Sequence, residues 1–199
     1  MAVRSKRSGA AARNSNRLRI IGGRWRGRKL VFPEAPGLRP TPDRVRETLF
    51  NWLSPVISGA RCLDLFCGSG ALSLEALSRG AGHATLIDLS TKVIRQLQQN
   101  LALLDCNNAE LIQADALSWL TGVSPNPGGG YDIIFLDPPF RQQLLDRCCS
   151  EIADRALLNP GGLVYLEMET GATPSLPSSW EIYRQTKAGN VCCYLCKTE

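Results

Sequence analysis

The sequence lacks any apolar run long enough to cross a membrane, and it contains a single histidine, His83. A membrane-spanning helix needs about 20 consecutive apolar residues, and the apolar runs here are far shorter. No apolar signal-peptide core follows the first residue, so we expect a cytoplasmic protein with no membrane partner. With one histidine and no second pair of spaced cysteines, the residues do not suit a zinc site, and we expect no metal.

Disulfides are not expected either, although the chain has eight cysteines. Most of these cysteines fall inside segments whose pattern is that of a strand or a helix. The spacing Cys193-x-x-Cys196 resembles half of a zinc site, but the other half is missing. We therefore expect reduced thiols with a structural role.

Acidic residues are scarce at the start of the chain, where residues 1–46 contain 13 Lys and Arg but only two acids, Glu34 and Asp43. The remainder carries 10 basic and 16 acidic residues, so the net charge of +5 is the sum of a basic N-terminal segment and an acidic remainder. This segregation is typical of a protein that binds a polyanion, because Lys and Arg contacts to phosphates provide most non-specific nucleic-acid affinity.

At 199 residues the chain has the size of one domain. Residues 1–16 have almost no large apolar side chain, which predicts a disordered basic tail. An organellar transit peptide is the alternative, although this segment lacks an amphipathic apolar face. Residues 17–199 are predicted to form a single domain, in which 17–40 are a basic hairpin extension and 41–199 are the core.

The segment Leu18–Leu30 reads as two short strands that turn at Gly22-Gly23. Its basic side chains surround one aromatic residue, and aromatic and guanidinium planes stack on unpaired bases. We predict an RNA-contacting hairpin, with a solvated edge hairpin as the alternative. The candidate RNA-binding residues are Arg19, Arg24, Trp25, Arg26, Arg28, Lys29, Arg39 and Arg44.

A helix is predicted to begin at Thr41-Pro42-Asp43, with Thr41 as its N-cap and Pro42 at the first helical position. We expect Arg44 and Arg46 to point away from its buried face, toward solvent or a ligand. The apolar residues that recur at helical spacing on that buried face are Val45, Leu49, Trp52 and Leu53.

From residue 60 onward, strand-like and helix-like segments alternate, which predicts an α/β fold with a mostly parallel seven-stranded sheet and helices on both faces. Only a short turn, Ala188–Asn190, joins the last two strands, so we expect them to form an antiparallel hairpin at one edge. The expected strands lie near 61–66, 84–88, 109–113, 131–136, 162–167, 180–186 and 191–197. The expected helices lie near 70–79, 91–104, 115–120 and 142–157.

Ligands of such sheets bind beyond the carboxyl ends of the strands, where the strand order reverses. The motif Asp64-x-Phe66-x-Gly68-x-Gly70 falls at such an end, and its glycines permit a tight turn and close approach of a ligand to the backbone. A dinucleotide fingerprint would place Gly or Ala at position 73, where this chain has Ser73. Alone, this glycine turn is a weak signal for a nucleotide-like cofactor.

Two further acids close predicted strands. Asp88 lies at the distance from the glycine turn that suits hydrogen bonds from ribose hydroxyls, and Asp115 is placed to accept from an adenine amino group. Each acid alone is equally well explained as a helix N-cap. Together with the glycine turn they predict an adenosine pocket, whose candidate cofactor-binding residues are Asp64, Phe66, Gly68, Gly70, Asp88, Leu89, Asp115, Ala116 and Asp137.

The most informative segment is Asp137-Pro138-Pro139-Phe140, directly after the apolar run 131–136. It brings together a hydrogen-bond acceptor, backbone carbonyls and a flat ring. An exocyclic amino group of a nucleobase needs this set if it is to be held in front of an electrophile. A proline-rich loop that merely stops a strand is the alternative. We predict Asp137, Pro138 and Phe140 as catalytic residues for methyl transfer to a base amine.

These motifs resemble those of the class I S-adenosylmethionine-dependent methyltransferases, whose fold is Rossmann-like. The segments Arg19–Leu30 and Leu38–Leu53 resemble more closely the bacterial family that methylates N2 of one guanine in 16S ribosomal RNA. Asp88 departs from the glutamate usual in that family, and Cys67 stands where alanine is frequent.

The resemblance implies S-adenosyl-L-methionine as cofactor and 16S rRNA as partner, within the small ribosomal subunit or an assembly intermediate, and nothing demands more than a monomer. It implies that Asp137 and the Pro138 carbonyl accept the two N2 hydrogens while Phe140 stacks on the base. The proton lost by the product would go to Asp137 or to water. Because N2 lies on the Watson–Crick edge, the guanine must be unpaired or flipped out of its stack.

Two rival interpretations stay open. An adenine-N6 methyltransferase acting on DNA or RNA is the first, because Asp-Pro-Pro-aromatic turns also occur in that class. Only the N-terminal segments argue against it. The second is a non-catalytic RNA-binding protein that kept the fold, and Asp88 together with the Asp137 turn argues against it.

Overall fold

The computed structural model describes residues 16–34, 41–123, 130–139 and 144–198. The predicted tail 1–16 therefore lies almost wholly outside the described residues. The strands in these ranges are β1 (Arg17–Arg19), β2 (Lys29–Val31), β3 (Arg61–Asp64), β4 (His83–Asp88), β5 (Ala109–Gln113), β6 (Tyr131–Leu136), β7 (Leu158–Glu169), β8 (Trp180–Ala188) and β9 (Val191–Thr198). The helices are a short 3-10 helix, η1 (Gly23–Trp25), and α1 (Asp43–Leu53), α2 (Ala71–Ser78), α3 (Thr91–Leu103), α4 (Ala116–Gly122) and α5 (Leu144–Asp154).

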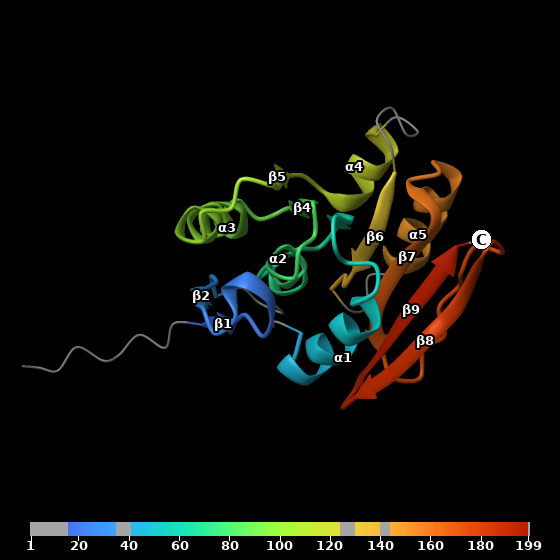
Figure 1. Cartoon of the computed structure of the whole chain (residues 1–199). Coiled ribbons are helices and arrows are strands. Elements are labelled where there is room, and N and C mark those ends of the chain that lie inside the picture. The colour runs from blue at the N-terminus through green and yellow to red at the C-terminus, as the bar shows by residue number, and fades with distance from the viewer. Residues whose placement is uncertain (1–15, 35–40, 124–129, 140–143, 199) are drawn as a thin grey trace, which may run out of the picture.

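Seven of these strands form one sheet in the order β5-β4-β3-β6-β7-β9-β8 (Figure 1). The pairs from β5 to β7 are parallel, whereas β9 runs antiparallel to both β7 and β8. The predicted α/β fold with an antiparallel C-terminal edge hairpin is therefore confirmed. The chain order reverses between β3 and β6, so the ligand site of this sheet is expected beyond their carboxyl ends.

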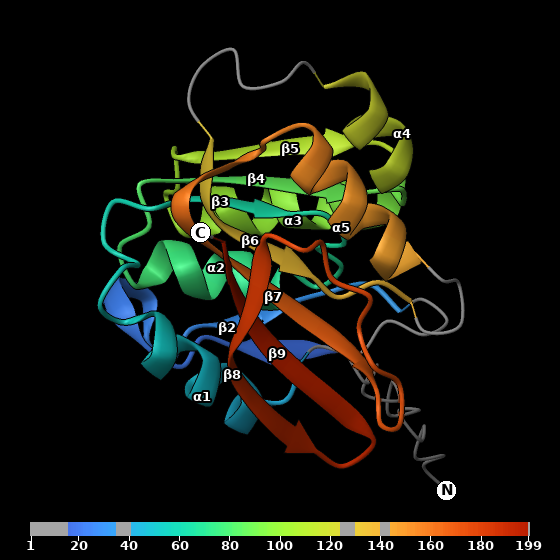
Figure 2. The ribbon, with the colours of Figure 1, turned by 90° about the vertical axis from the view of Figure 1, so that its right-hand side faces the viewer.

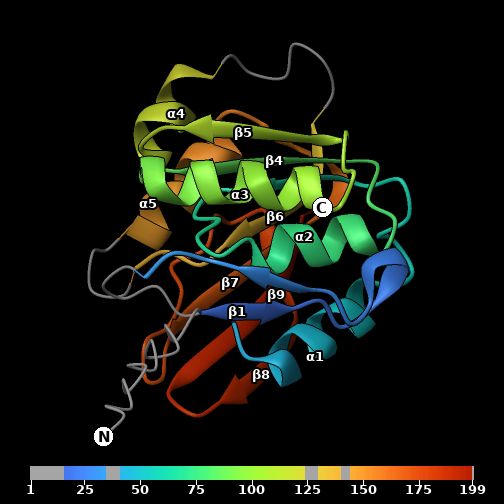
Figure 3. The same cartoon turned by 90° about the vertical axis from the view of Figure 1, so that its left-hand side faces the viewer.

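Helices cover both faces of the sheet. α4 and α5 lie on one face (Figure 2), and α1, α2, α3 and the β1–β2 hairpin lie on the other (Figure 3). Residues of β6 alternate accordingly, with Ile133 and Phe135 in the core on the hairpin side and Ile134 and Leu136 in the core under α5. The ring centroid of Phe135 lies 6.4 Å from that of Tyr165 in β7 and 6.3 Å from that of Phe50 in α1, so aromatic rings pack between these strands and α1.

The β1–β2 hairpin packs against α2 through its connecting segment. Leu18 faces Leu30 across the pair, and both side chains are buried. The predicted turn directly at Gly22-Gly23 was wrong, because the two strands are joined by a longer segment that contains η1. Gly23 has a φ of 72°, and a Cβ there would lie 1.8 Å from the Ser78 carbonyl oxygen, so only glycine fits this contact.

Two expectations for α1 were wrong. Pro42 is the N-cap residue, and the Thr41 hydroxyl instead donates a hydrogen bond of 2.8 Å to Oε1 of Glu167. Arg46 does not face solvent, because its side chain is only 1% exposed and forms an ion pair with Glu75 of α2. The predicted apolar face of α1 is confirmed by buried Val45, Leu49 and Leu53 and by partly buried Trp52.

All eight cysteines are free thiols, and seven of them are buried. No helix among the described residues is long and apolar enough to cross a membrane. Within the same ranges, no group of three or more His, Cys, Asp or Glu side chains is arranged to hold a metal ion.

Candidate active site

Four acidic side chains lie at the carboxyl ends of neighbouring strands. Asp64 ends β3, Asp88 ends β4, Asp137 directly follows β6, and Glu167 lies two residues before the end of β7. Their charges act on one another, since Asp88 raises the pKa of Asp64, and Glu167 and Asp64 raise the pKa of Asp137 beyond the effect of burial. A cluster of like charges of this kind favours a ligand that carries positive charge.

Asp64, the last residue of β3, is held by a contact with α2. The Ser73 hydroxyl donates a hydrogen bond to Oδ2 of Asp64, so the residue that breaks the dinucleotide pattern has a role here. Burial raises the pKa of Asp64 to about 7. Gly70 has a φ of 76°, and a Cβ on it would lie 2.6 Å from the side chain of Leu97. Because α3 packs closely against the glycine turn and φ is positive, the position requires glycine.

Asp88 ties the end of β4 to the glycine turn. Its Oδ2 accepts a hydrogen bond from the Gly68 amide at 3.0 Å, and its Oδ1 accepts from the Ser90 amide at 2.8 Å. The N-cap of α3 is Ser90, so the helix-cap alternative for Asp88 is not supported. The next side chain, Leu89, is 69% exposed. An exposed apolar side chain beside a fixed carboxylate fits a nucleoside, which has a flat ring and ribose hydroxyls.

For Asp115 the helix-cap alternative is confirmed. Its Oδ1 accepts from both the amide and the hydroxyl of Ser118, at 2.8 and 2.9 Å, and these bonds hold the pKa of Asp115 below its usual value. An ionised acceptor therefore stands at the end of β5, and its contact with adenine stays a prediction. Ala116 is buried, and Phe66 packs partly buried against the core on the α5 side.

The Asp137 turn lies between β6 and α5. Asp137 is half-buried, Pro138 is buried and Pro139 is exposed. Burial raises the pKa of Asp137 well above its usual value, and the carboxylates of Glu167 and Asp64 raise it further. Phe140 lies outside the described residues, so its stacking on the base stays a prediction.

Glu167 is a site residue that the sequence reasoning missed. It is only 4% exposed, and its Oε1 accepts hydrogen bonds from the hydroxyls of Thr41 and Tyr165, at 2.8 and 2.9 Å. Its position in the strand register identifies it, because Glu167 follows Leu166 in β7 as Asp137 follows the paired Leu136 in β6.

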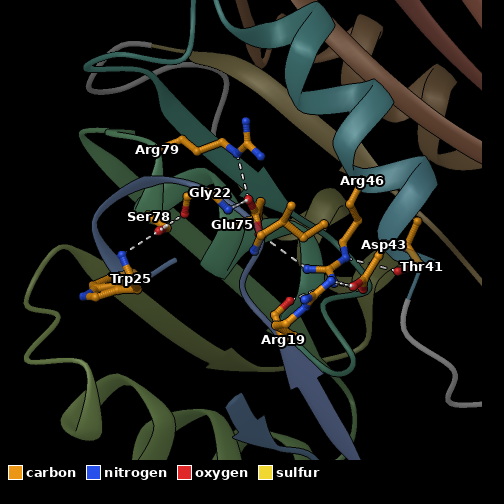
Figure 4. Close-up of polar contacts among 10 residues, drawn as sticks. Arg19, Gly22, Trp25, Thr41, Asp43, Arg46, Glu75, Ser78 and Arg79 are labelled. Carbon is orange, nitrogen blue, oxygen red and sulfur yellow. Dashed lines mark hydrogen bonds and ion pairs between the residues drawn. The ribbon is translucent and has the colours of Figure 1, made fainter. Parts of the chain in front are cut away.

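A second missed group anchors the hairpin beside this site (Figure 4). Glu75 of α2 is buried and accepts hydrogen bonds of 2.8 Å from the amides of Ile21 and Gly22. It also pairs with Arg46 at 3.4 Å and with Arg79 at 2.7 Å. One carboxylate therefore holds the hairpin, α1 and α2 together.

The predicted RNA-binding residues have different surroundings. Trp25 does not offer a free ring, because the side chain is only 8% exposed, so the prediction that it stacks on a base is not supported. Arg24 instead covers that ring at 4.0 Å, Arg19 pairs with Asp43 at 3.0 Å, and Arg28 donates to a backbone carbonyl. Arg39 lies outside the described residues. The other candidates, whose side chains are also exposed, are Arg26, Lys29 and Arg44.

The chain is similar to known proteins over nearly its whole length. Residues 18–197 match the family model described as Conserved hypothetical protein 95. Ribosomal RNA small subunit methyltransferase D of Escherichia coli K12 is 50% identical over 178 residues, which cover 89% of this chain and 88% of that protein. The protein of the same name from Haemophilus influenzae is 43% identical, covering 87% and 90%. The solved structure of yhhF from Escherichia coli superimposes with a TM-score of 0.85 at 46% identity, covering 92% and 99%.

A parallel sheet with this strand order, a glycine turn after β3, an acid at the end of β4 and an Asp-Pro-Pro turn after β6 define a class I methyltransferase. More narrowly, the chain belongs to the family described as Conserved hypothetical protein 95, which its model matches over 18–197.

Proposed function

We propose that this chain transfers a methyl group from S-adenosyl-L-methionine to the exocyclic N2 of a guanine in the 16S rRNA of the small ribosomal subunit. The observation that carries the proposal is the position of the Asp137-Pro138 turn, at the point where the strand order reverses. The neighbouring strand β3 ends in the glycine turn, whose Gly68 amide donates a hydrogen bond to Asp88. The names of the relatives support rRNA of the small subunit as the substrate class.

Each side of the site has its own task in this proposal. Gly68, Asp88 and Leu89 hold the adenosine part, and the acidic cluster receives the positively charged part of the methyl donor. When bound, S-adenosyl-L-methionine supplies a methyl group on a sulfonium, which is a good electrophile. The protein therefore mainly has to orient a poor nucleophile, and correct positioning alone contributes up to roughly 7–11 kcal/mol.

The substrate amine is held by the turn after β6. Asp137 and the Pro138 carbonyl accept the two N2 hydrogens, which turns the nitrogen lone pair toward the methyl group. Phe140 stacks on the base and fixes its plane. The guanine must leave any pairing or stacking partner to reach this turn.

In this proposal the basic extension, residues 17–40, and α1 bind the RNA around the target guanine. Arg26, Lys29 and Arg44 contact phosphates in this proposal, since their side chains are exposed. The protein acts as a monomer on the small subunit or on an assembly intermediate. It works in the cytoplasm, where bacterial ribosomes are assembled, as its bacterial relatives suggest.

The experiment is methyl transfer from labelled S-adenosyl-L-methionine to small ribosomal subunits that lack their native modification, followed by mass analysis of the nucleosides. The proposal predicts labelled N2-methylguanosine at a single position. Labelled N6-methyladenosine would replace guanine by adenine as the acceptor, and binding of the methyl donor without any labelled nucleoside would refute the proposed substrate.

A further inference from the structure

Asp137 and Glu167 occupy equivalent positions on two adjacent parallel strands. The register pairs Leu136 of β6 with Leu166 of β7, so the next residue along each strand is one of these two acids. Side chains alternate along a strand, and Phe135 and Tyr165, two residues earlier, lie edge to face on the hairpin side of the sheet. Asp137 and Glu167 therefore lie side by side on that same face.

The surroundings of the two carboxyl groups are unequal. Burial raises the pKa of Glu167, but the hydrogen bonds that it accepts from the Thr41 and Tyr165 hydroxyls lower it and favour its ionised form. Asp137 faces the carboxylates of Glu167 and Asp64, and these charges and its burial all favour the protonated form. Two carboxyl groups whose charges interact titrate as a pair, and the pair's proton is held mainly by the member whose negative charge is less stabilised by its surroundings.

Two other titratable groups lie near the pair among the described residues, and neither neutralises it. Cys193 of β9 lies near both acids, and burial raises its pKa to about 12, so its thiol carries no charge near neutral pH. Arg46 donates to the Thr41 carbonyl at 3.2 Å, but its charge is paired with Asp43 and Glu75. Within the part of the chain that the structure describes, no cation lowers the pKa of Asp137.

We propose that Glu167 is a positioning residue that makes Asp137 hold a proton in the free enzyme and release it when the cationic methyl donor binds. This inference rests on the proposed function, since it assigns a task to the same site. A sulfonium next to the pair favours the ionised form of Asp137, which is the form that accepts both a substrate hydrogen bond and, later, a proton.

The same pair accounts for the proton that the reaction must remove. The N2–carbon bond forms as the carbon–sulfur bond breaks, the electron pair stays on sulfur, and the sulfur becomes neutral. The proton affinity of Asp137 then rises again, at the moment when the methylated nitrogen has a proton to lose. Asp137 takes that proton and returns to its starting state, and water receives the proton when the next methyl donor binds.

The test is a calorimetric titration in two buffers of different ionisation enthalpy at about pH 7, which counts the protons released on binding. S-adenosyl-L-methionine and S-adenosylhomocysteine differ only in the charged methyl group on sulfur. We expect proton release with the first and much less with the second. As the pH rises through the pKa of Asp137 in the free enzyme, the affinity for the first should rise relative to the second, by about tenfold for each unit by which binding lowers that pKa.

Glu167→Gln keeps an oxygen that accepts from Thr41 and Tyr165 but removes the charge beside Asp137. In this variant the pKa of free Asp137 is lower, because burial and Asp64 still raise it but Glu167 no longer does. Proton release with S-adenosyl-L-methionine therefore falls toward the S-adenosylhomocysteine level, and the acidic limb of the pH–rate profile moves to lower pH. Glu181→Gln, which removes an exposed charge on β8, should match the parent protein.

Equal proton release with the two ligands in the parent protein would overturn the inference, even if Glu167→Gln failed to fold. So would undiminished release by a folded Glu167→Gln. If neither ligand binds, the proposed function itself fails, so the two failures are distinguishable.

Discussion

Arg46 and Glu75 form an ion pair of 3.4 Å that is hidden from solvent on both sides. The pair joins α1 to α2, and Glu75 also holds the amides of Ile21 and Gly22 from the hairpin connection. The backbone carbonyl of Arg19 accepts from Arg46 at 2.9 Å, which adds β1 to the same group. Through these contacts β1 and the hairpin connection are held against α1 and α2, and Arg46 joins them to Thr41, which contacts Glu167.

Removing the charge of Glu75 should therefore cost more than removing an exposed charge. Glu75→Gln leaves Arg46 and Arg79 without part of their compensation in a buried place, and we expect a loss of about 3 kcal/mol in the free energy of unfolding. Glu151→Gln makes the same chemical change in a partly exposed pair with Arg155 and should cost about 0–1 kcal/mol. Urea unfolding measures both values, and equal losses would contradict this account of the hairpin anchor.

Asp88 is predicted to hold the methyl donor. Asp88→Ala removes the acceptor for the ribose and frees the Gly68 amide, so the affinity for S-adenosyl-L-methionine should fall about tenfold or more, in line with roughly 1.5–3 kcal/mol for a hydrogen bond to a charged group. Asp88→Glu keeps the carboxylate and should retain most of the affinity. Asp154→Ala, an exposed change on α5, is the control, and a similar loss there would remove Asp88 from the binding site.

The exposed basic residues of the extension and of α1 are predicted to bind phosphates of the RNA. Replacing Arg26, Lys29 and Arg44 by Gln should weaken RNA binding and flatten its salt dependence, by roughly 0.7–0.9 in slope for each phosphate that the variant no longer neutralises. The matched control replaces Arg184, Lys187 and Lys197, which are exposed on β8 and β9. If the two triple variants show the same slope, Arg26, Lys29 and Arg44 do not bind the RNA.

Asp64 should make the free protein less stable as the pH rises. Its pKa is raised from 3.8 to about 7, so the folded state binds a proton more tightly than the unfolded state. The resulting stabilisation is complete below 3.8 and is lost as the pH rises through about 7. Asp64→Asn mimics the protonated form, and its free energy of unfolding should fall less over this range. An identical pH dependence for the two proteins would show that Asp64 does not carry this linkage.

The alternation of segments after residue 60 was sufficient to predict the sheet and its edge hairpin, because βαβ units leave few topologies open. Asp64, Asp88 and Asp137 could be placed from sequence, because each follows a strand-like run directly. Arg46, Glu75 and Glu167 could not, because a charged residue in a helix or strand reads as solvated unless its partner is known. Their partners are 29 and 126 residues away in the chain.

Trp25 is a residue whose burial could not be predicted from the sequence. Its basic neighbours predicted an exposed stacking ring, yet the Trp25 amide bonds to the Ser78 hydroxyl at 3.0 Å and the ring is buried. Only the packing of the hairpin connection on α2, through Gly23, decides this, and no local pattern encodes that packing.

The central claim is that Asp137 orients the substrate amine, and single-turnover methyl transfer by Asp137→Ala tests it most directly. The variant should bind S-adenosyl-L-methionine nearly as tightly as the parent protein, while transfer to the small subunit falls by about 10²-fold or more, because the amine is no longer held in line with the methyl group. Transfer at the parent rate, or equal loss of binding and transfer, would contradict the claim and leave Asp137 with a structural role.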